Sequence, residues 1–84
     1  MTRVRITAEA AREFERMPLP IQTRMAKVFE RLERWPYVSG VKALRGSLQS
    51  RFRLRTGDYR VQIRVRGDVV HVEKVGHRDG FYEE

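Results

Sequence analysis

The chain has no cysteine among its 84 residues, so it can form neither a disulfide framework nor a thiolate metal site. It also lacks an apolar run near the roughly 20 residues that cross a bilayer, and its start, MTRVRITAEA, lacks the apolar segment of a secretion signal. We therefore expect a cytoplasmic protein without membrane contact. Residues 1–84 are expected to form one domain, because so short a chain cannot divide into two parts with separate cores.

Acidic residues are scarce where basic residues are dense. The segment from Lys42 to Arg66 contains eight basic residues and one acidic residue, Asp58, so it carries the whole net charge of +7. Arginine supplies 15 of the 18 basic residues. Its guanidinium grips phosphate with a planar fork, whereas lysine offers a point charge. The clustering indicates an anionic partner.

Hydrophobic periodicity in the first half predicts a short strand followed by two helices. The strand is RVRIT, and Thr7 is placed to cap the helix AEAAREFERM, which Pro18 ends. The second helix, in PLPIQTRMAKVFERLERWP, has the clearest pattern in the chain. Its apolar stripe consists of Ile21, Met25, Val28, Phe29, Leu32 and Trp35.

The second half changes to a period of two residues. After a surface connection, YVSGVKALRGSLQS, apolar and polar residues alternate from Arg51 onward, with turns at TGD and at Gly67–Asp68. Three consecutive antiparallel strands result, and their apolar face needs a cover of about the size of a helical hairpin. We expect an α+β fold in which the amino-terminal strand and helical hairpin pack on an antiparallel, four-stranded sheet.

The arginines of the first two meander strands are expected to share one face, because Leu54, Val61 and Ile63 must face the helices. This set comprises Arg51, Arg53, Arg55, Arg60, Arg64 and Arg66. Like charges at strand spacing repel one another, so an external polyanion is the favoured explanation, and nucleic acid is the dense polyanion of a cytosol. The alternative is a solvated sheet face whose charges discourage edge-to-edge association.

The sequence shows no Cys/His cluster, no carboxylate pair beside the arginines and no Ser-His-Asp arrangement with supporting glycines. We therefore expect neither a metal nor another cofactor. RNA carries its own nucleophile, the 2′-hydroxyl, and attack on the neighbouring phosphate needs alignment, charge stabilisation and proton transfer. Arginines supply the second of these requirements directly.

Three segments in this order, LRG (44–46), RFRLRTGDYRV (51–61) and VGHRDGFY (75–82), resemble the RelE family of toxins, within the RelE/ParE superfamily. The resemblance extends over nearly the whole chain. It implies a RelE-like fold and a toxin that enters the ribosomal decoding site and cuts messenger RNA there without metal. It also implies a cognate antitoxin that holds the toxin inactive.

The resemblance assigns roles to individual residues. Arg51 and Arg53 stand where RelE has two active-site lysines. Arg60 corresponds to an arginine that contacts the scissile phosphate, and Arg78 to one that supports the transition state or the leaving group. Tyr82 matches a terminal tyrosine that stacks on a base and helps orient the nucleophile. Further RNA contacts are expected from Arg45, Arg55, Arg64 and Arg66.

Because arginine stands in place of both lysines, proton abstraction needs another residue: a guanidinium keeps its proton at physiological pH and cannot act as the base. His77 is the candidate base, since an imidazole titrates near neutral pH and this one adjoins Arg78. The alternative is a turn residue that packs locally. Tyr59 is expected on the apolar side, and His71 is expected to be a structural or exposed strand residue.

Two other functions stay open. A toxin of the ParE branch would share the fold but poison DNA gyrase by binding it. A catalytically inactive RNA-binding module of the same fold would keep the basic surface without the reaction. Basic residues stand at positions 51, 53, 60 and 78, as they do in RelE, and together with Tyr82 they favour the nuclease.

Overall fold

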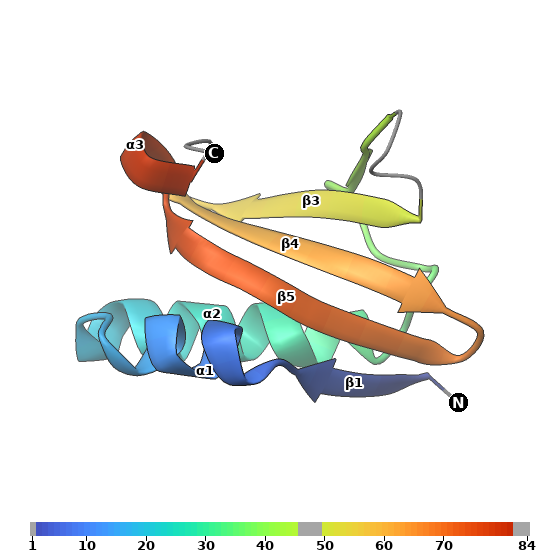
Figure 1. Ribbon diagram of the computed structural model, residues 1–84, viewed down its shortest axis with the longest axis horizontal. Coiled ribbons are helices and arrows are strands. Elements are labelled where there is room, and N and C mark those ends of the chain that lie inside the picture. Colours follow the sequence, from blue (N-terminus) through green and yellow to red (C-terminus); the bar gives the residue numbers. More distant parts are fainter. Residues whose placement is uncertain (1, 46–49, 82–84) are drawn as a thin grey trace.

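Residues 2–45 and 50–81 are described by a computed structural model, in which helices and a sheet form two layers (Figure 1). The helices are α1 (Ala8–Glu15), α2 (Leu19–Leu32) and the short α3 (Arg78–Phe81). The strands are β1 (Arg3–Ile6), β2 (Lys42–Ala43), β3 (Arg51–Thr56), β4 (Tyr59–Arg66) and β5 (Val69–His77). The α+β class expected from the sequence is confirmed.

The two longer helices begin and end where their sequence signals lie. The Thr7 hydroxyl accepts a hydrogen bond from the Ala10 amide at 3.1 Å and so caps α1. Pro18 separates the helices, and Pro20 occupies the first turn of α2, where its missing N–H is not needed. Both helices lie on the same side of the sheet in Figure 1. No helix in the described ranges is long and apolar enough to cross a membrane.

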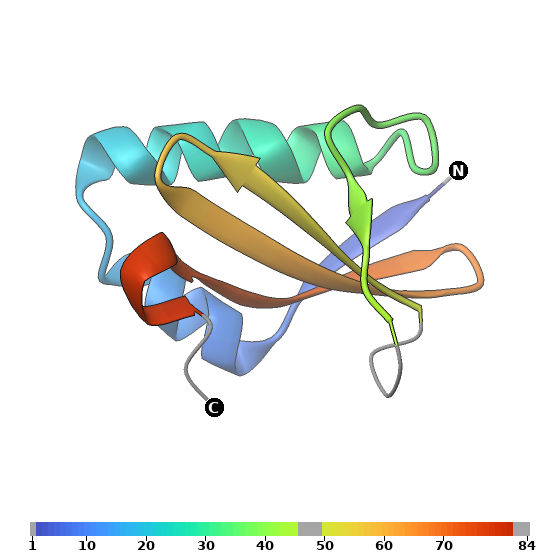
Figure 2. The ribbon, with the colours of Figure 1, turned by 90° about the horizontal axis from the view of Figure 1, so that it is seen from above.

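The sheet differs from the expected one in strand number and direction. It has five strands in the order β1-β5-β4-β3-β2, and β1 runs parallel to β5. The added strand, β2, comes from the segment expected to be a surface connection, where Lys42 and Ala43 pair with Arg53 and Phe52. A parallel pair needs a long connection, which the helices and intervening strands provide for β1 and β5. The strands cross at an angle in Figure 2 because the sheet is twisted.

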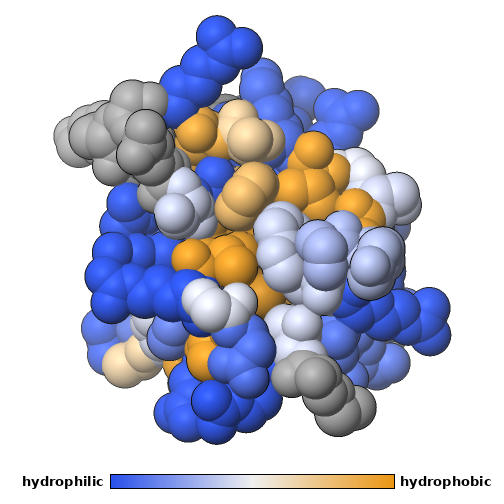
Figure 3. All heavy atoms as spheres, turned by 90° about the vertical axis from the view of Figure 1, so that its right-hand side faces the viewer, coloured by the Kyte–Doolittle hydropathy of each residue, from blue (hydrophilic) through white to orange (hydrophobic). Residues whose placement is uncertain are grey.

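The core lies between the helical layer and the sheet. Its largest fully buried side chains come from α2, β4 and β5, and are Met25, Leu32, Val61, Ile63, Val70, Val72 and Val75. Trp35 and Phe52 pack on this core with ring centroids 4.8 Å apart. Figure 3 views the end of the molecule where β1 begins. There, hydrophobic side chains reach the surface in the centre and hydrophilic ones surround them.

Replacing Leu32, which is 0% exposed, by alanine should lower the free energy of unfolding by about 2–5 kcal/mol, because it removes buried apolar surface and leaves a cavity. Urea denaturation followed by circular dichroism measures the change. Leu19→Ala is the matched control, since Leu19 is 74% exposed and its loss should change stability by less than about 0.5 kcal/mol. Equal effects of the two substitutions would contradict the described packing.

Candidate functional site

The strand arginines lie on the sheet face opposite the helices. In β4, Val61 and Ile63 are fully buried, so the residues between and beside them point away from the core. Cross-strand pairing then places Arg51 beside Arg64 and Arg55 beside Arg60. We call this surface the arginine face; its members are Arg51, Arg53, Arg55, Arg60, Arg64 and Arg66.

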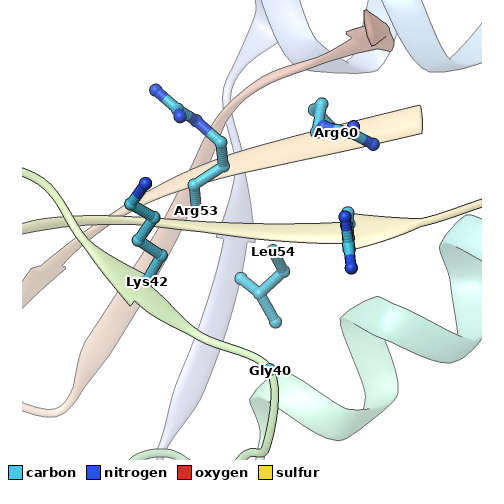
Figure 4. A pocket seen from close by; sticks show the side chains of 6 residues that line it. Gly40, Lys42, Arg53, Leu54 and Arg60 are labelled. Carbon is cyan, nitrogen blue, oxygen red and sulfur yellow. The ribbon is translucent and has the colours of Figure 1, made fainter. Parts of the chain in front are cut away.

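Two arginines of β3 and one of β4 line a cavity of about 240 Å³ together with Lys42. We call it the basic cavity; it is lined by Gly40, Lys42, Arg53, Leu54, Arg55 and Arg60. It forms because β2 pairs with only two residues of β3, which leaves the edge of β3 open beyond Arg53. Figure 4 shows Lys42 and Arg53 projecting from neighbouring strands to one side of β3, whereas Leu54 points to the other side.

Arg60 is held at this cavity by the turn that precedes it. Its Nη1 donates to the carbonyl oxygens of Gly57 at 3.1 Å and Tyr59 at 3.2 Å. Gly57 has a φ of 60°, a backbone conformation that glycine adopts readily, so the TGD turn positions the guanidinium. A preorganised cationic donor of this kind stabilises charge that develops on a bound oxyanion.

Arg51 is arranged differently, because it is paired with an internal carboxylate. Its Nε donates to Oε1 of Glu73 at 2.6 Å, and Nε2 of Gln62 donates to the same oxygen at 3.0 Å. Arg51 and Glu73 line a second hollow together with Gln62, Lys74 and, at the start of α1, Thr7 and Glu9. The arginine face is thus divided between the basic cavity and this neutralised region.

Arg64 and Arg66 line a third hollow with His71. Cross-strand pairing puts His71 beside Arg64 on the outer face, where it is half-buried. His71 is therefore an outward-facing strand residue. The six arginines share one face but do not all point into one cavity.

Phe81 covers part of the outer face, although sequence reasoning did not identify it. It is 3% exposed, and its ring lies 4.7 Å from Nζ of Lys74 and 6.0 Å from the Arg53 guanidinium carbon. Lys74 also donates a hydrogen bond to the Phe81 carbonyl oxygen. The ring also lies against Gly76, where a Cβ would be in ordinary van der Waals contact with Phe81 Cδ1 at 3.6 Å. These contacts dock α3 beside Arg53.

Arg78, at the start of α3, is tied to the turn that also carries Arg60. Its backbone N–H donates to the Asp58 carbonyl oxygen at 2.8 Å, and its exposed side chain lies 3.8 Å from the Asp58 carboxylate and 3.7 Å from that of Asp79. Arg45 is exposed on the segment after β2. Tyr82 lies outside the described residues.

His77 does not join the arginine face. It pairs with Tyr59 across β4 and β5, and the two rings meet edge to face at 5.2 Å on the core side of the sheet. Nδ1 of His77 accepts a hydrogen bond from the Asp79 amide at 3.1 Å. The same nitrogen lies 3.4 Å from the Asp79 carboxylate, so local contacts hold the ring beside α3 and off the arginine face.

Tyr59 packs against the core, as its place in the strand pattern indicates. Among the residues that the structure describes, no three His, Cys, Asp or Glu side chains group as metal ligands would. Sequence reasoning missed Lys42, Gln62, Glu73, Lys74 and Phe81. The sequence did carry a signal for Glu73 and Lys74: these two successive polar residues interrupt the alternation of apolar and polar residues in VVHVEKV.

Similar solved structures place this architecture in a known family. The toxin–antitoxin complex RelBE2 from Mycobacterium tuberculosis contains a chain that is 30% identical, with a TM-score of 0.80 over 92% of this chain and 98% of that one. The chain belongs to the RelE family. Its fold is that of the RelE-like toxins of type II toxin–antitoxin systems.

Two further RelE structures show the same fold. The RelE–RelB complex from Pyrococcus horikoshii matches with 26% identity and a TM-score of 0.77, over 92% of this chain and 94% of that chain. The isolated RelE toxin of E. coli matches with 20% identity and a TM-score of 0.78, over 92% and 84%. No protein-family model and no curated protein matches the sequence.

Replacing Phe81 by alanine should release α3 from the sheet of this RelE-family protein, because a four-residue helix is not stable without tertiary contacts. Hydrogen exchange should then show faster exchange at the Arg78 amide, with slow exchange retained in β4. Tyr37→Ala is the control, since Tyr37 is 87% exposed. Unchanged protection at Arg78 in the Phe81 variant would show that the ring does not anchor α3.

Proposed function

We propose that this protein is a ribosome-dependent endoribonuclease, the toxin of a type II toxin–antitoxin system, and that it inhibits translation by cutting messenger RNA. The observation that carries the proposal is the basic cavity, where Arg53, Arg55 and Arg60 lie with Lys42 on the face opposite the core. Membership of the RelE family supports the same activity.

The reaction needs no metal in this proposal. The 2′-oxygen of one nucleotide attacks its own 3′-phosphate, the bond from phosphorus to the 5′-oxygen breaks, and a 2′,3′-cyclic phosphate and a 5′-hydroxyl result. The 2′-hydroxyl loses a proton and the departing 5′-oxygen gains one. The pentavalent transition state carries additional negative charge, which cationic donors stabilise.

The arginines take distinct parts in this reaction. Arg60, fixed by the carbonyl oxygens of its turn, and Arg53, beside it in the basic cavity, bind the phosphate whose charge increases. Arg78, joined to the same turn through Asp58, stabilises the leaving oxygen. Lys42 and Arg55 hold the neighbouring phosphates. Tyr82 stacks on a base, the role that the family resemblance implies.

An antitoxin is the proposed protein partner, and messenger RNA on the ribosome is the proposed substrate. Relatives from Mycobacterium tuberculosis and Pyrococcus horikoshii were crystallised as toxin–antitoxin complexes. Such a partner would neutralise the arginine face with acidic side chains or displace α3, whose docking depends on Phe81.

Arg60→Ala should slow cleavage of ribosome-bound message by about 100-fold or more, as the loss of a preorganised oxyanion donor does. Primer extension on programmed ribosomes measures the cut in the decoding-site codon. Arg34→Ala, which removes the same charge from an exposed position after α2, should cleave at the native rate. Absence of any cut by the native protein would refute the nuclease. Gyrase poisoning instead would select the ParE-like activity, and neither activity would select an inert RNA-binding module.

Arg53→Ala should also weaken binding to single-stranded RNA in a salt-dependent way. Loss of one phosphate contact lowers the slope of log affinity against log salt by about 0.7 for single strands. Fluorescence titrations with 2′-O-methyl RNA, which has no nucleophile, measure this slope separately from cleavage. An unchanged slope for Arg53→Ala would place the RNA path away from the basic cavity.

A further inference from the structure

Glu73 is a carboxylate inside the arginine face, and a β-bulge brings it there. Ile63 pairs with Val72 and Gln62 pairs with Lys74, so Glu73 is the extra residue between them. Val72 and Val75, on either side, are both buried in the core. The two residues between these valines therefore both face outward, which places a negative charge among the arginines.

The contact between Glu73 and Arg51 is short and shielded. Their atoms lie 2.6 Å apart, and the side chains are 21% and 22% exposed. By contrast, the surface pair of Arg3 and Asp68 spans 3.7 Å with side chains that are 63% and 65% exposed. Charge-assisted hydrogen bonds at short distance are strong, whereas exposed pairs contribute little. Glu73 therefore fixes the orientation of Arg51.

The part of the guanidinium that Glu73 contacts decides what Arg51 can still do. Oε1 of Glu73 accepts from Nε, on the side of the guanidinium, so the contact does not use the two terminal nitrogens. Those nitrogens form the planar fork that binds a phosphate with two parallel hydrogen bonds. Gln62 donates to the same carboxylate oxygen and holds it in place. Arg51 is thus oriented without losing its phosphate-binding end.

We propose that Glu73 is a positioning residue for RNA cleavage, which orients Arg51 so that its terminal fork meets a phosphate next to the scissile one. The inference rests on the function proposed above. Glu73 adds negative charge to a surface that attracts RNA, so it lowers affinity while it raises the rate of the chemical step. A solvated charge without this role would lower affinity alone.

Two variants of Glu73 separate these effects. Glu73→Ala removes the carboxylate and should slow single-turnover cleavage at saturating ribosome concentration by about 10-fold to 100-fold, the size of effect that misplaced active-site groups produce. Its affinity for 2′-O-methyl RNA should equal or exceed that of the native protein. Glu73→Gln keeps an oxygen that accepts from Arg51 and should cleave within about threefold of the native rate.

A double-mutant cycle tests whether Glu73 acts through Arg51. If it does, Glu73→Ala should cause no further loss of rate once Arg51 is already alanine, because interacting residues are not additive. Asp68→Ala is the control: it removes a carboxylate of the exposed pair with Arg3 and should leave the rate unchanged. Thermal unfolding of each variant shows whether the fold is retained.

Three results would overturn the inference. In the first, Glu73→Ala cleaves as fast as the native protein. In the second, Glu73→Ala slows the Arg51→Ala variant by the same factor by which it slows the native protein. In the third, Glu73→Gln is as slow as Glu73→Ala. The last result would assign proton transfer to the carboxylate instead of positioning. Each can occur while the native protein cuts and Arg60→Ala cuts much more slowly, so failure of this inference differs from failure of the proposed function.

Discussion

Burial of Val61 and Ile63 in β4 is the constraint on which the functional surface depends. Both are 0% exposed in the core between helices and sheet. Side chains of a strand alternate between its faces, so this burial forces Arg60, Gln62 and Arg64 outward. The register with β3 then brings the outward residues of the two strands together. The hydrophobic effect thus determines where the cationic groups of the sheet lie.

The parts of the structure set by local periodicity were predictable, and those set by pairing partners were not. The stripe containing Met25 and Leu32 identified α2 and its buried face. Nothing in the two residues Lys42 and Ala43 marks a strand, because β2 exists only through its pairing with β3. Likewise, α3 is too short for a sequence period, and Phe81 is buried by contacts with distant residues.

The candidate site, too, was predictable from the sequence only in part. Alternation places the six arginines on one face, but it does not indicate which of them share a cavity. The sequence suggested a surface without internal counter-charge, whereas Arg51 is paired with Glu73. The expectation for His77 rested on its nearness to Arg78 in the chain. In the fold, its ring lies on the core side with Tyr59.

The bulge in β5 changes the phase of the alternation within a single strand. Before it, Val70 and Val72 are buried in the core, and after it Val75 is; His77 lies on the same side of the sheet as Val75, but its side chain is 43% exposed. In a strand without the bulge, residue 77 would lie on the outer side of the sheet and residue 76 on the core side. One inserted residue therefore keeps the His77 imidazole off the arginine face and places Gly76 on the outer side of the sheet, next to the Phe81 ring.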